Sequence, residues 1–359
     1  MLAALAGISA VAYADSLVVT ISLGYLYVLP LSLTALTRYR RTTFSLVGVC
    51  VVLHDWLGPY AHTGWQMLHR GVLTLIGFTV VVMFVGKLAD QRRRLMQVVS
   101  AQRNELALEL AQAAKVQQRM LPQESPNIPG IEIAGLMSPS KELGGDYYDY
   151  IELPQGNLGL VIADVSGKGT EAALFMPSIE VALHMDTHSP SPSNKVVTNL
   201  NRVLYDLTEQ TRYVTLFYAK LDVPRRTLEY TNAGHFPPVV LRVREPEIWL
   251  TEGGPVVGLL PEASYQTASV ALNPGDVLIL YTDGVIDAEN DKEEMFSVER
   301  LVSVARTNRA KTAQELVQMI QSSVFSFAGT EELRDDLTLV VLKVLPDNTE
   351  TNQGAPEPR

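Results

Sequence analysis

The chain has 359 residues, with 29 Lys and Arg against 39 Asp and Glu and a formal net charge of −10. Two acidic and five basic side chains fall in the first 87 residues, so this part carries +3 and the remainder −13. Such an acidic remainder argues against nucleic-acid binding, because phosphate backbones are held mainly by Lys and Arg. The single cysteine, Cys50, lies in an apolar run. A disulfide framework, a zinc cluster and a catalytic thiolate are therefore excluded.

Residues 1–87 are predicted to form a transmembrane region of about four helices. Leu17–Thr37 is a run of 21 uncharged, mostly apolar residues, and a helix needs ~20 to cross a bilayer core. Gly71–Gly86 is also uncharged, Thr42–Leu57 contains two ionisable residues, and Met1–Ala14 is shorter than a full crossing. Met1–Ala14 is also open to interpretation as a signal peptide, because it ends in Ala-Tyr-Ala, although it has no basic start.

The basic residues predict the orientation of these helices. One short loop holds Arg38, Arg40 and Arg41, and a second basic group runs from Lys87 to Arg94. Because short cytoplasmic loops are enriched in Lys and Arg, both groups are expected in the cytoplasm. The chain is thus predicted to be a multi-pass protein of the inner (cytoplasmic) membrane, with everything after the last span in the cytoplasm. Four ionisable residues near the outer face either sense a ligand or simply face water: His54, Asp55, His62 and His69.

Residues 88–121 contain no Gly or Pro and are rich in Ala, Leu, Gln, Glu and Arg, which favours a long helix that ends before Pro122. Apolar residues recur at every seventh position: Val99, Leu106, Ala113 and Met120. The companion positions are half polar: Leu95, Gln102, Glu109 and Val116. A half-polar seam of this kind pairs two chains only weakly. A coiled-coil connector that forms a homodimer is therefore predicted. The alternative is a helix packed on its own domain.

Residues 122–346 are predicted to form one domain, and residues 347–359 a disordered tail. Strands are expected at Ile131–Met137, Tyr147–Leu153, Leu158–Asp164, Tyr213–Asp222, Thr227–Thr231, Pro238–Val243, Asp276–Asp283 and Leu337–Leu345. Helices are expected at Gly169–Asp186, Asn194–Thr208, Ser297–Arg306 and Ala313–Phe327. Strands in succession with helices in pairs predict an α+β fold, an antiparallel β-sandwich flanked by helices.

Aspartates stand at the ends of four predicted strands. They are Asp146 in GGDYYD, Asp164 in ADVSGKG, Asp283 in YTDG, and Asp335 and Asp336 in RDDLT. One aspartate beside a glycine is more often only a turn former, but four such sites favour a shared function. Carboxylates that converge repel one another unless cations bind, and hard oxygen ligands select Mg²⁺ or Mn²⁺.

The series GGDYYD, ADVSGKG, NAGHFPP, YTDG and RDDLT resembles the PPM (PP2C-type) serine/threonine phosphatases of the bacterial stress-response and sporulation type, the RsbU/SpoIIE-like family. The resemblance spans about Arg119–Leu345 and implies an αββα fold. It also implies two Mn²⁺ or Mg²⁺ ions, bridged by Asp164 and completed by these ligands: the Val165 carbonyl, Asp146, Asp283 and Asp335. Asp336 is the alternative to Asp335, since neighbours on a strand point to opposite faces.

In this family a water activated by two metal ions attacks phosphorus, which implies catalytic roles for Asp146 and Asp164. Eukaryotic relatives bind phosphate with an arginine before the first aspartate. This chain lacks it, and Lys141 is the nearest cationic substitute. His235 either donates a proton to the leaving serine oxygen or stabilises its own turn. The implied substrate is a phosphoserine or phosphothreonine on a regulatory protein such as the antagonist of an anti-sigma factor.

Other functions fit the motifs less well. Diguanylate cyclases share the Gly-Gly-Asp triplet, but here two tyrosines replace their Glu-Phe. Residues 162–168 lack the spacing of a P-loop, and the connector has no histidine for a sensor kinase. The remaining alternative is a catalytically degenerate phosphatase fold that acts as a binding module. Intact candidates at every metal position argue against it.

Overall fold

The computed structural model describes residues 2–17, 24–35, 40–57, 64–167, 169–185, 191–208 and 212–346. The chain forms two compact units, Met1–Ala107 and Leu108–Arg359. The predicted disordered tail lies outside the described residues, as do Arg38 and His62 of the predicted membrane region.

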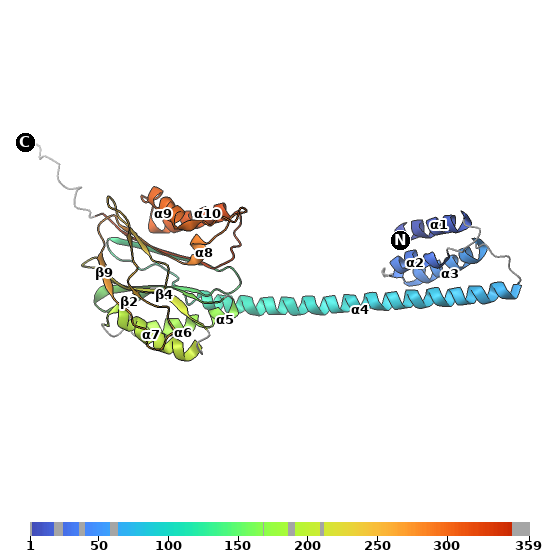
Figure 1. Cartoon of the computed structure of the whole chain (residues 1–359), viewed down its shortest axis with the longest axis horizontal. Coiled ribbons are helices and arrows are strands. Elements are labelled where there is room, and N and C mark those ends of the chain that lie inside the picture. Colours follow the sequence, from blue (N-terminus) through green and yellow to red (C-terminus); the bar gives the residue numbers. More distant parts are fainter. Residues whose placement is uncertain are drawn as a thin grey trace, which may run out of the picture. The chain divides into compact units, whose positions relative to one another are not determined.

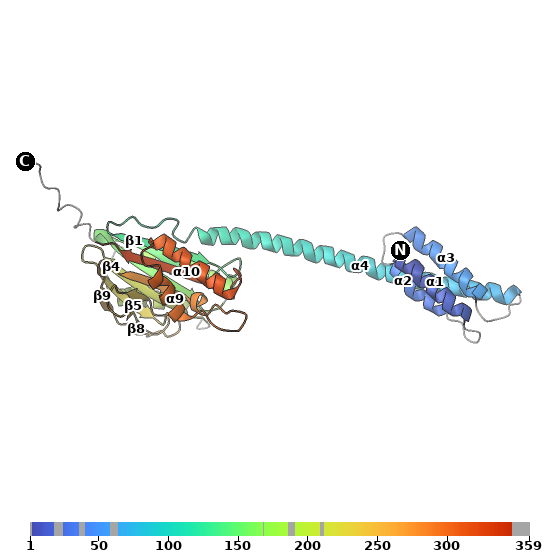
Figure 2. The same cartoon turned by 90° about the horizontal axis from the view of Figure 1, so that it is seen from above.

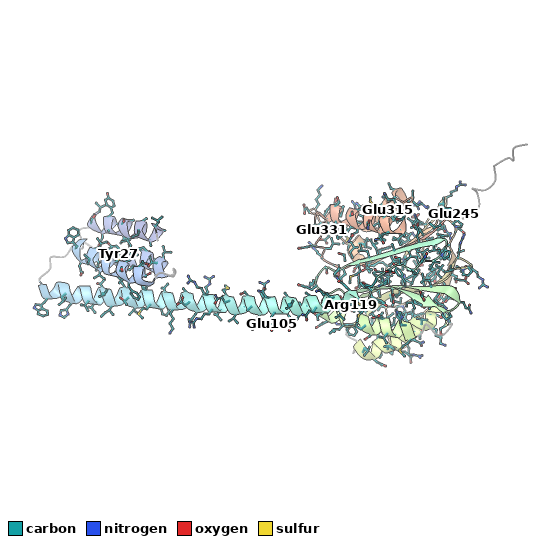
Figure 3. The ribbon with its side chains drawn as sticks, turned by 180° about the vertical axis from the view of Figure 1, so that it is seen from behind. Tyr27, Glu105, Arg119, Glu245, Glu315 and Glu331 are labelled. Atoms are coloured by element: carbon teal, nitrogen blue, oxygen red, sulfur yellow. The ribbon has the colours of Figure 1, made fainter. Side chains whose placement is uncertain are left out.

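The N-terminal unit is a cluster of helices: α1 (Leu2–Leu17), the 3₁₀ helix η1 (Gly24–Tyr27), α2 (Val28–Ala35), α3 (Arg40–Leu57) and the first part of α4 (Gly64–Gln118). Its small core is apolar and includes Tyr27, which is labelled in Figure 3. The buried residues are Ile8, Tyr27, Leu31, Val47, Cys50, Phe78 and Val82. All four α-helices thus pack around one core.

Among the described helices, α4 is long and apolar enough to cross a membrane by length and composition, from Gly71 onward. The other apolar stretches have 10–17 residues, so the predicted four spans are not confirmed. Of the predicted span Leu17–Thr37, the structure describes Leu17 and residues 24–35, which form η1 and α2, and the rest lies outside the described residues. Pro30 lies in the first turn of α2, where its missing N–H is tolerated, whereas in the middle of a longer helix it would remove a hydrogen bond.

The predicted last span and the helical connector are one element, because α4 runs without a break from Gly64 to Gln118. Glu105 is exposed on its surface (Figure 3). Several apolar side chains of the connector are also at least half exposed: Leu95, Val99, Leu106 and Val116. The coiled-coil seam and its alternative, a helix packed on its own domain, both remain predictions.

Two β-sheets form the centre of the C-terminal unit. The first has the order β1 (Ile131–Ser138), β11 (Leu337–Val344), β10 (Val277–Tyr281), β6 (Val239–Leu241) and β7 (Ile248–Trp249). The second has the order β2 (Asp146–Leu153), β3 (Asn157–Val165), β4 (Val214–Asp222), β5 (Thr227–Ala233) and β8 (Gly253–Gly254), and β9 (Ala268–Ala271) also pairs with β5. All pairs are antiparallel except β5 with β8.

Helices cover the outer faces of both sheets. Figure 1 shows α6 (Met176–Met185) and α7 (Ser193–Thr208) on one side, and α9 (Ser297–Thr307) and α10 (Ala313–Ala328) on the other. Figure 2 shows α9 and α10 lying over the sheets. The predicted α+β sandwich is therefore confirmed. The described part of the unit also contains three short helices: η2 (Pro154–Gly156), α5 (Thr170–Ala173) and α8 (Asp283–Ile286).

The first sheet is buried on both faces, and its strands divide their residues between two cores. Leu278 and Leu280 join the core shared with the second sheet, whereas Ile279 joins the core under α9 and α10. This alternation follows from the two-residue period of a strand. One predicted helix, Gly169–Asp186, is instead divided into α5 and α6, and Pro177 again lies in the first turn of the second piece.

Candidate active site

Asp146 and Asp164 are brought together by the pairing of two strands. Asp146 begins β2, and Asp164 is its direct partner near the end of β3. Residues directly opposite each other in an antiparallel pair have Cβ atoms about 4.5–5.5 Å apart. Two carboxylates predicted to share a site therefore do meet at one edge of the second sheet.

Asp146 is buried and is held by the other sheet. Its Oδ2 accepts hydrogen bonds from the Thr282 hydroxyl at 2.7 Å and from the Thr338 hydroxyl at 2.6 Å. Burial, followed by the neighbouring charge of Asp164, raises the pKa of the Asp146 carboxyl well above its ordinary value. The two threonine hydrogen bonds oppose this shift because they favour the ionised form. Both threonines belong to motifs quoted above, but the sequence alone did not indicate their role.

Asp283 and the Asp335–Asp336 pair are neighbours through their backbones. Asp283 begins α8. A Cβ added to Gly284 would lie 2.0 Å from the Asp336 carbonyl oxygen, so only glycine permits this close approach. The start of α8 is thereby packed against the segment that leads into β11. Asp283 and Asp335 are both part-buried.

Asp335 and Asp336 face different surroundings. The Asp336 carboxylate accepts hydrogen bonds from the Ser140 backbone N–H at 2.7 Å, the Ser140 hydroxyl at 3.0 Å and the Gly145 backbone N–H at 2.6 Å. It therefore organises the loop between β1 and β2. Asp335 instead lines a cavity. Both residues precede β11, so the strand alternation assumed from the sequence does not apply to them.

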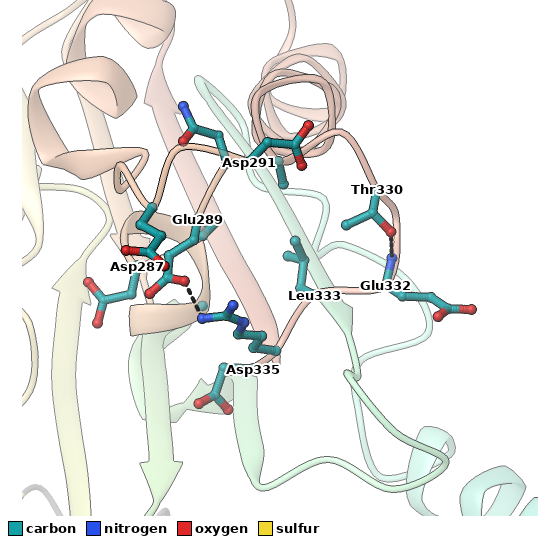
Figure 4. Close-up of a pocket in the computed structure, with 13 residues that line it drawn as sticks. Asp287, Glu289, Asp291, Thr330, Glu332, Leu333 and Asp335 are labelled. Carbon is teal, nitrogen blue, oxygen red and sulfur yellow. Dashed lines mark hydrogen bonds and ion pairs between the residues drawn. The ribbon is translucent and has the colours of Figure 1, made fainter.

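That cavity has a volume of about 410 Å³, and acidic side chains are the largest group in its lining (Figure 4). Its acidic residues are Asp287, Glu289, Asp291, Glu293, Glu332 and Asp335. Arg334 forms an ion pair with Glu289 across it. Burial, then the charges of Asp335 and Glu289, raise the pKa of Asp287. The cavity thus concentrates negative charge beside Asp335.

Val165 and Lys141 are the two remaining predicted site residues near the loop that carries Asp146. Val165 is the last residue of β3, and a Cβ added to Gly145 would lie 3.3 Å from its carbonyl oxygen. The Val165 carbonyl is therefore close to the loop that carries Asp146. Lys141 is exposed in that same loop, next to the Ser140 that bonds Asp336.

His235 is buried and uses both ring nitrogens. Nδ1 lies 2.9 Å from the Thr215 hydroxyl, and Nε2 lies 3.1 Å from the Tyr281 carbonyl oxygen. Since a carbonyl only accepts, Nε2 carries the proton and Nδ1 accepts from the threonine. Burial lowers the pKa of His235 to about 4. A neutral histidine tied on both sides has no free proton to donate, so the geometry favours the interpretation in which it stabilises its own turn.

The donor set suits a hard divalent cation. Carboxylates and a backbone carbonyl are the ligands that Mg²⁺ and Mn²⁺ prefer, and a positive charge beside Asp146 would oppose the rise in its pKa. Among the residues that the structure describes, however, no three His, Cys, Asp or Glu side chains are grouped closely enough to hold an ion as they stand.

Comparisons with known proteins agree on one family. The family model described as Stage II sporulation protein E (SpoIIE) matches residues 154–345. "Phosphoserine phosphatase RsbU" of Bacillus subtilis (strain 168) is 29% identical over 282 residues, which cover 78% of this chain and 82% of that protein. "Phosphoserine phosphatase RsbP" of the same organism is 30% identical over 183 residues, 50% of this chain and 45% of RsbP. The chain therefore spans less than half of RsbP.

Solved structures agree on the fold. The SiaA-PP2C domain of Pseudomonas aeruginosa superposes with a TM-score of 0.61 at 20% identity, covering 68% of this chain and 99% of that domain. The RsbU and RsbW domains of a Mycobacterium tuberculosis protein give a TM-score of 0.54 at 25% identity and cover 62% of this chain and 63% of that one. The C-terminal unit thus has a PP2C-like fold.

Proposed function

This chain belongs to the Stage II sporulation protein E (SpoIIE) family, and from that premise we propose that it is a metal-dependent protein-serine/threonine phosphatase. The observation that carries the proposal is the direct pairing of Asp146 with Asp164, with Asp146 fixed by Thr282 and Thr338 from the opposite sheet. Relatives named phosphoserine phosphatases support the same reaction.

We propose Mn²⁺ or Mg²⁺, two ions, as the cofactor. The expected ligands are Asp146, Asp164, the Val165 carbonyl, Asp283 and Asp335, with Asp164 shared. When bound, such ions supply an activated water and neutralise the phosphoryl oxygens. Thr282 and Thr338 orient Asp146 and favour its ionised form. Asp336 stays out of the ligand set because its oxygens are already committed to the backbone N–H groups of the β1–β2 loop.

The proposed substrate is a phosphoserine or phosphothreonine on a regulatory protein, as the family resemblance implies, and an anti-sigma factor antagonist is the first candidate. Lys141 is the proposed phosphate-binding cation, because it is exposed on the loop that carries Asp146. His235 is no longer proposed as a proton donor. It supports the site from behind, by linking β4 to the end of β10.

We further propose an inner-membrane location, with α4 as one of several spans and the C-terminal unit in the cytoplasm. The exposed apolar residues of the connector, such as Val99 and Leu106, support a homodimer formed through α4. These proposals are independent of the chemistry, so they are tested separately.

The deciding experiment measures phosphate release from a phosphoserine protein by the purified full-length chain. We expect turnover with Mn²⁺ or Mg²⁺ and none in EDTA. Asp336→Asn serves as a matched carboxylate control for Asp164→Asn, which should be the more severe change. Full activity in EDTA would refute metal dependence, and binding of the phosphoprotein without turnover would instead indicate a degenerate binding module.

A further inference from the structure

The pairing of β3 with β4 continues for one residue pair beyond the two strands. The Ser166 N–H donates to the Tyr213 carbonyl oxygen at 2.9 Å, and the Tyr213 N–H donates to the Ser166 hydroxyl at 2.9 Å. Arg212 Nη1 then donates to the Ser166 carbonyl oxygen at 2.8 Å. A Cβ on Gly167 would collide with the Arg212 guanidinium, so glycine follows Ser166 for a steric reason. The serine of the ADVSGKG motif thus uses all of its polar groups to hold Arg212 and Tyr213.

This pairing places Tyr213 beside Asp164. Thr215 is the direct partner of Asp164 on β4. Residues two apart on a strand lie on the same face, so Tyr213 shares the face of Thr215. In an antiparallel pair, a residue two positions from the direct partner is about 7–8 Å away, within reach of an aromatic side chain. Tyr213 is 41% exposed. It is therefore an exposed aromatic residue at the edge of the candidate site.

Tyr213 is presented to a ligand with little freedom left to lose. Its backbone is fixed by Ser166, and the neighbouring charge of Arg212 is paired with Glu171 of α5. The side chain of a tyrosine has only two χ angles, so it supplies apolar contact area at a low cost in conformational entropy. This is one reason why tyrosine is enriched among the residues that dominate protein recognition.

The segment on the other side of β4 adds exposed apolar residues. Val214 and Val257 exchange two backbone hydrogen bonds, at 2.9 Å and 2.8 Å, so the loop after Val257 begins beside Tyr213. That loop exposes Leu259 by 40% and Leu260 by 49%. Tyr213 therefore has apolar neighbours along this edge. They favour an apolar side chain as the ligand, since removal of apolar surface from water is favourable.

We propose that Tyr213 is a specificity-determining residue of the candidate site: its ring contacts an apolar side chain next to the phosphoserine of the substrate. Neighbouring Cα atoms of a peptide are about 3.8 Å apart, so a phosphoserine bound at Asp164 brings the residues beside it within reach of this ring. The contact forms only if the proposed function holds, because a phosphorylated substrate must first bind at Asp164. It would select the sequence around the phosphoserine, which the proposed function leaves open.

The test compares kcat/KM of the purified full-length chain, with Mn²⁺, on two phosphoserine peptides. One has leucine on both sides of the phosphoserine and the other has asparagine, so the two peptides carry the same charge. The parent chain is expected to prefer the leucine peptide by roughly tenfold, the lower end for an apolar contact because the ring is partly exposed. Tyr213→Ala should remove most of this preference, and Tyr213→Phe, which keeps the ring, should retain it.

The preference is a ratio measured within one preparation, so a loss of folded protein or of bound metal does not change it. Met319→Ala, at an exposed apolar position on α10, is the matched control and should keep the preference. Equal turnover of both peptides by the parent chain, or an unchanged preference in Tyr213→Ala, would overturn the specificity role and leave the proposed function intact. Loss of the preference in Tyr213→Phe would assign it to the hydroxyl group and overturn the apolar contact. A parent chain inactive on both peptides would count against the proposed function, and the specificity role would fall with it.

Discussion

α4 and α10 are both rich in apolar residues, but they present them to opposite surroundings. α10 buries its apolar face against β1 and β11. The buried residues include Leu316, Val317, Ile320 and Val324. In the first part of α4, Phe78 and Val82 are buried, whereas a larger set is exposed. The exposed residues include Leu73, Ile76, Val80 and Phe84.

The difference lies in what covers each helix. The C-terminal unit covers α10 with its own sheets, and a capping box between Thr312 and Glu315 fixes where the helix starts. α4 leaves a continuous apolar surface, and such a surface is stable only when something apolar covers it. A bilayer around Gly71–Gly86 and a second copy around the connector are the covers we propose. The two units should therefore respond differently to the same kind of substitution.

The largest effect is expected from Asp164→Asn in the C-terminal unit. The change removes charge from the carboxylate proposed to contact both ions, so kcat should fall about a thousandfold, which corresponds to several kcal/mol. Membrane association should be unchanged, because α4 is untouched. Phosphate release and cell fractionation on the same preparation check both statements. A variant with near-parental kcat would contradict the two-metal site.

The next largest effects are expected from one substitution in α10 and one in α4, which test the different surroundings of these two helices. Leu316→Ala should lower the free energy of unfolding of the C-terminal unit by about 2–5 kcal/mol, as for other buried leucines. Val80→Arg should leave the stability of the C-terminal unit unchanged. It should lower the fraction of the protein that stays in the membrane after alkaline extraction, since an arginine at the centre of a span costs about 2.5–3.5 kcal/mol. Val80→Leu is the control. Equal extraction of all three chains would mean that α4 does not face lipid.

A smaller effect should distinguish Asp335 from Asp336. Asp335→Asn is expected to raise the Mn²⁺ concentration needed for half-maximal rate by roughly tenfold or more, because a charged ligand is lost. Asp336→Asn should mainly lower stability, since its oxygens accept three hydrogen bonds from the β1–β2 loop. Metal titrations and urea unfolding on both variants provide the comparison. The reverse pattern would show that the inward-facing aspartate has been misassigned.

His235 gives a pH-dependent prediction. Its folded pKa, about 4, lies below the ordinary value of about 6.5, so acid protonates the unfolded chain first. Stability should therefore fall as pH decreases from about 6.5 towards 4, and the loss attributable to His235 between pH 7 and pH 5 should be about 2 kcal/mol. Urea unfolding of the parent chain and His235→Gln at both pH values isolates this contribution. An equal pH dependence in the two chains would exclude it.

The sequence predicted most of the C-terminal unit because local pattern and burial agree there. α7, α9 and α10 differ from their predicted bounds by at most a residue at each end, and the four aspartate motifs do lie at strand ends. The short strands β7, β8 and β9 were missed, because two to four residues carry too little periodicity. An apolar count over Leu17–Thr37 could not predict that α2 begins at Val28, two residues before Pro30. Nothing in Gln117 itself signalled the two hydrogen bonds between its side-chain amide and the Gly144 backbone, which depend on tertiary contact.

The smallest expected effect concerns the connector seam, where Gln102 and Glu109 interrupt an otherwise apolar series. Polar residues at such positions weaken a coiled coil, so Gln102→Leu with Glu109→Leu should tighten pairing between two chains. Both chains would carry Leu106→Cys and Cys50→Ala, so that cross-linking reports pairing at a single exposed position.

If the connector relays its geometry to the site through the end of α4, the rate should change by a few-fold when pairing tightens, in either direction. More cross-linking with an unchanged phosphatase rate would mean that α4 only attaches the C-terminal unit and relays no change to the site. An absence of cross-links in both chains would mean that the exposed seam is covered by something other than a second copy, and the contrast between α4 and α10 would then hold for the bilayer part of α4 alone.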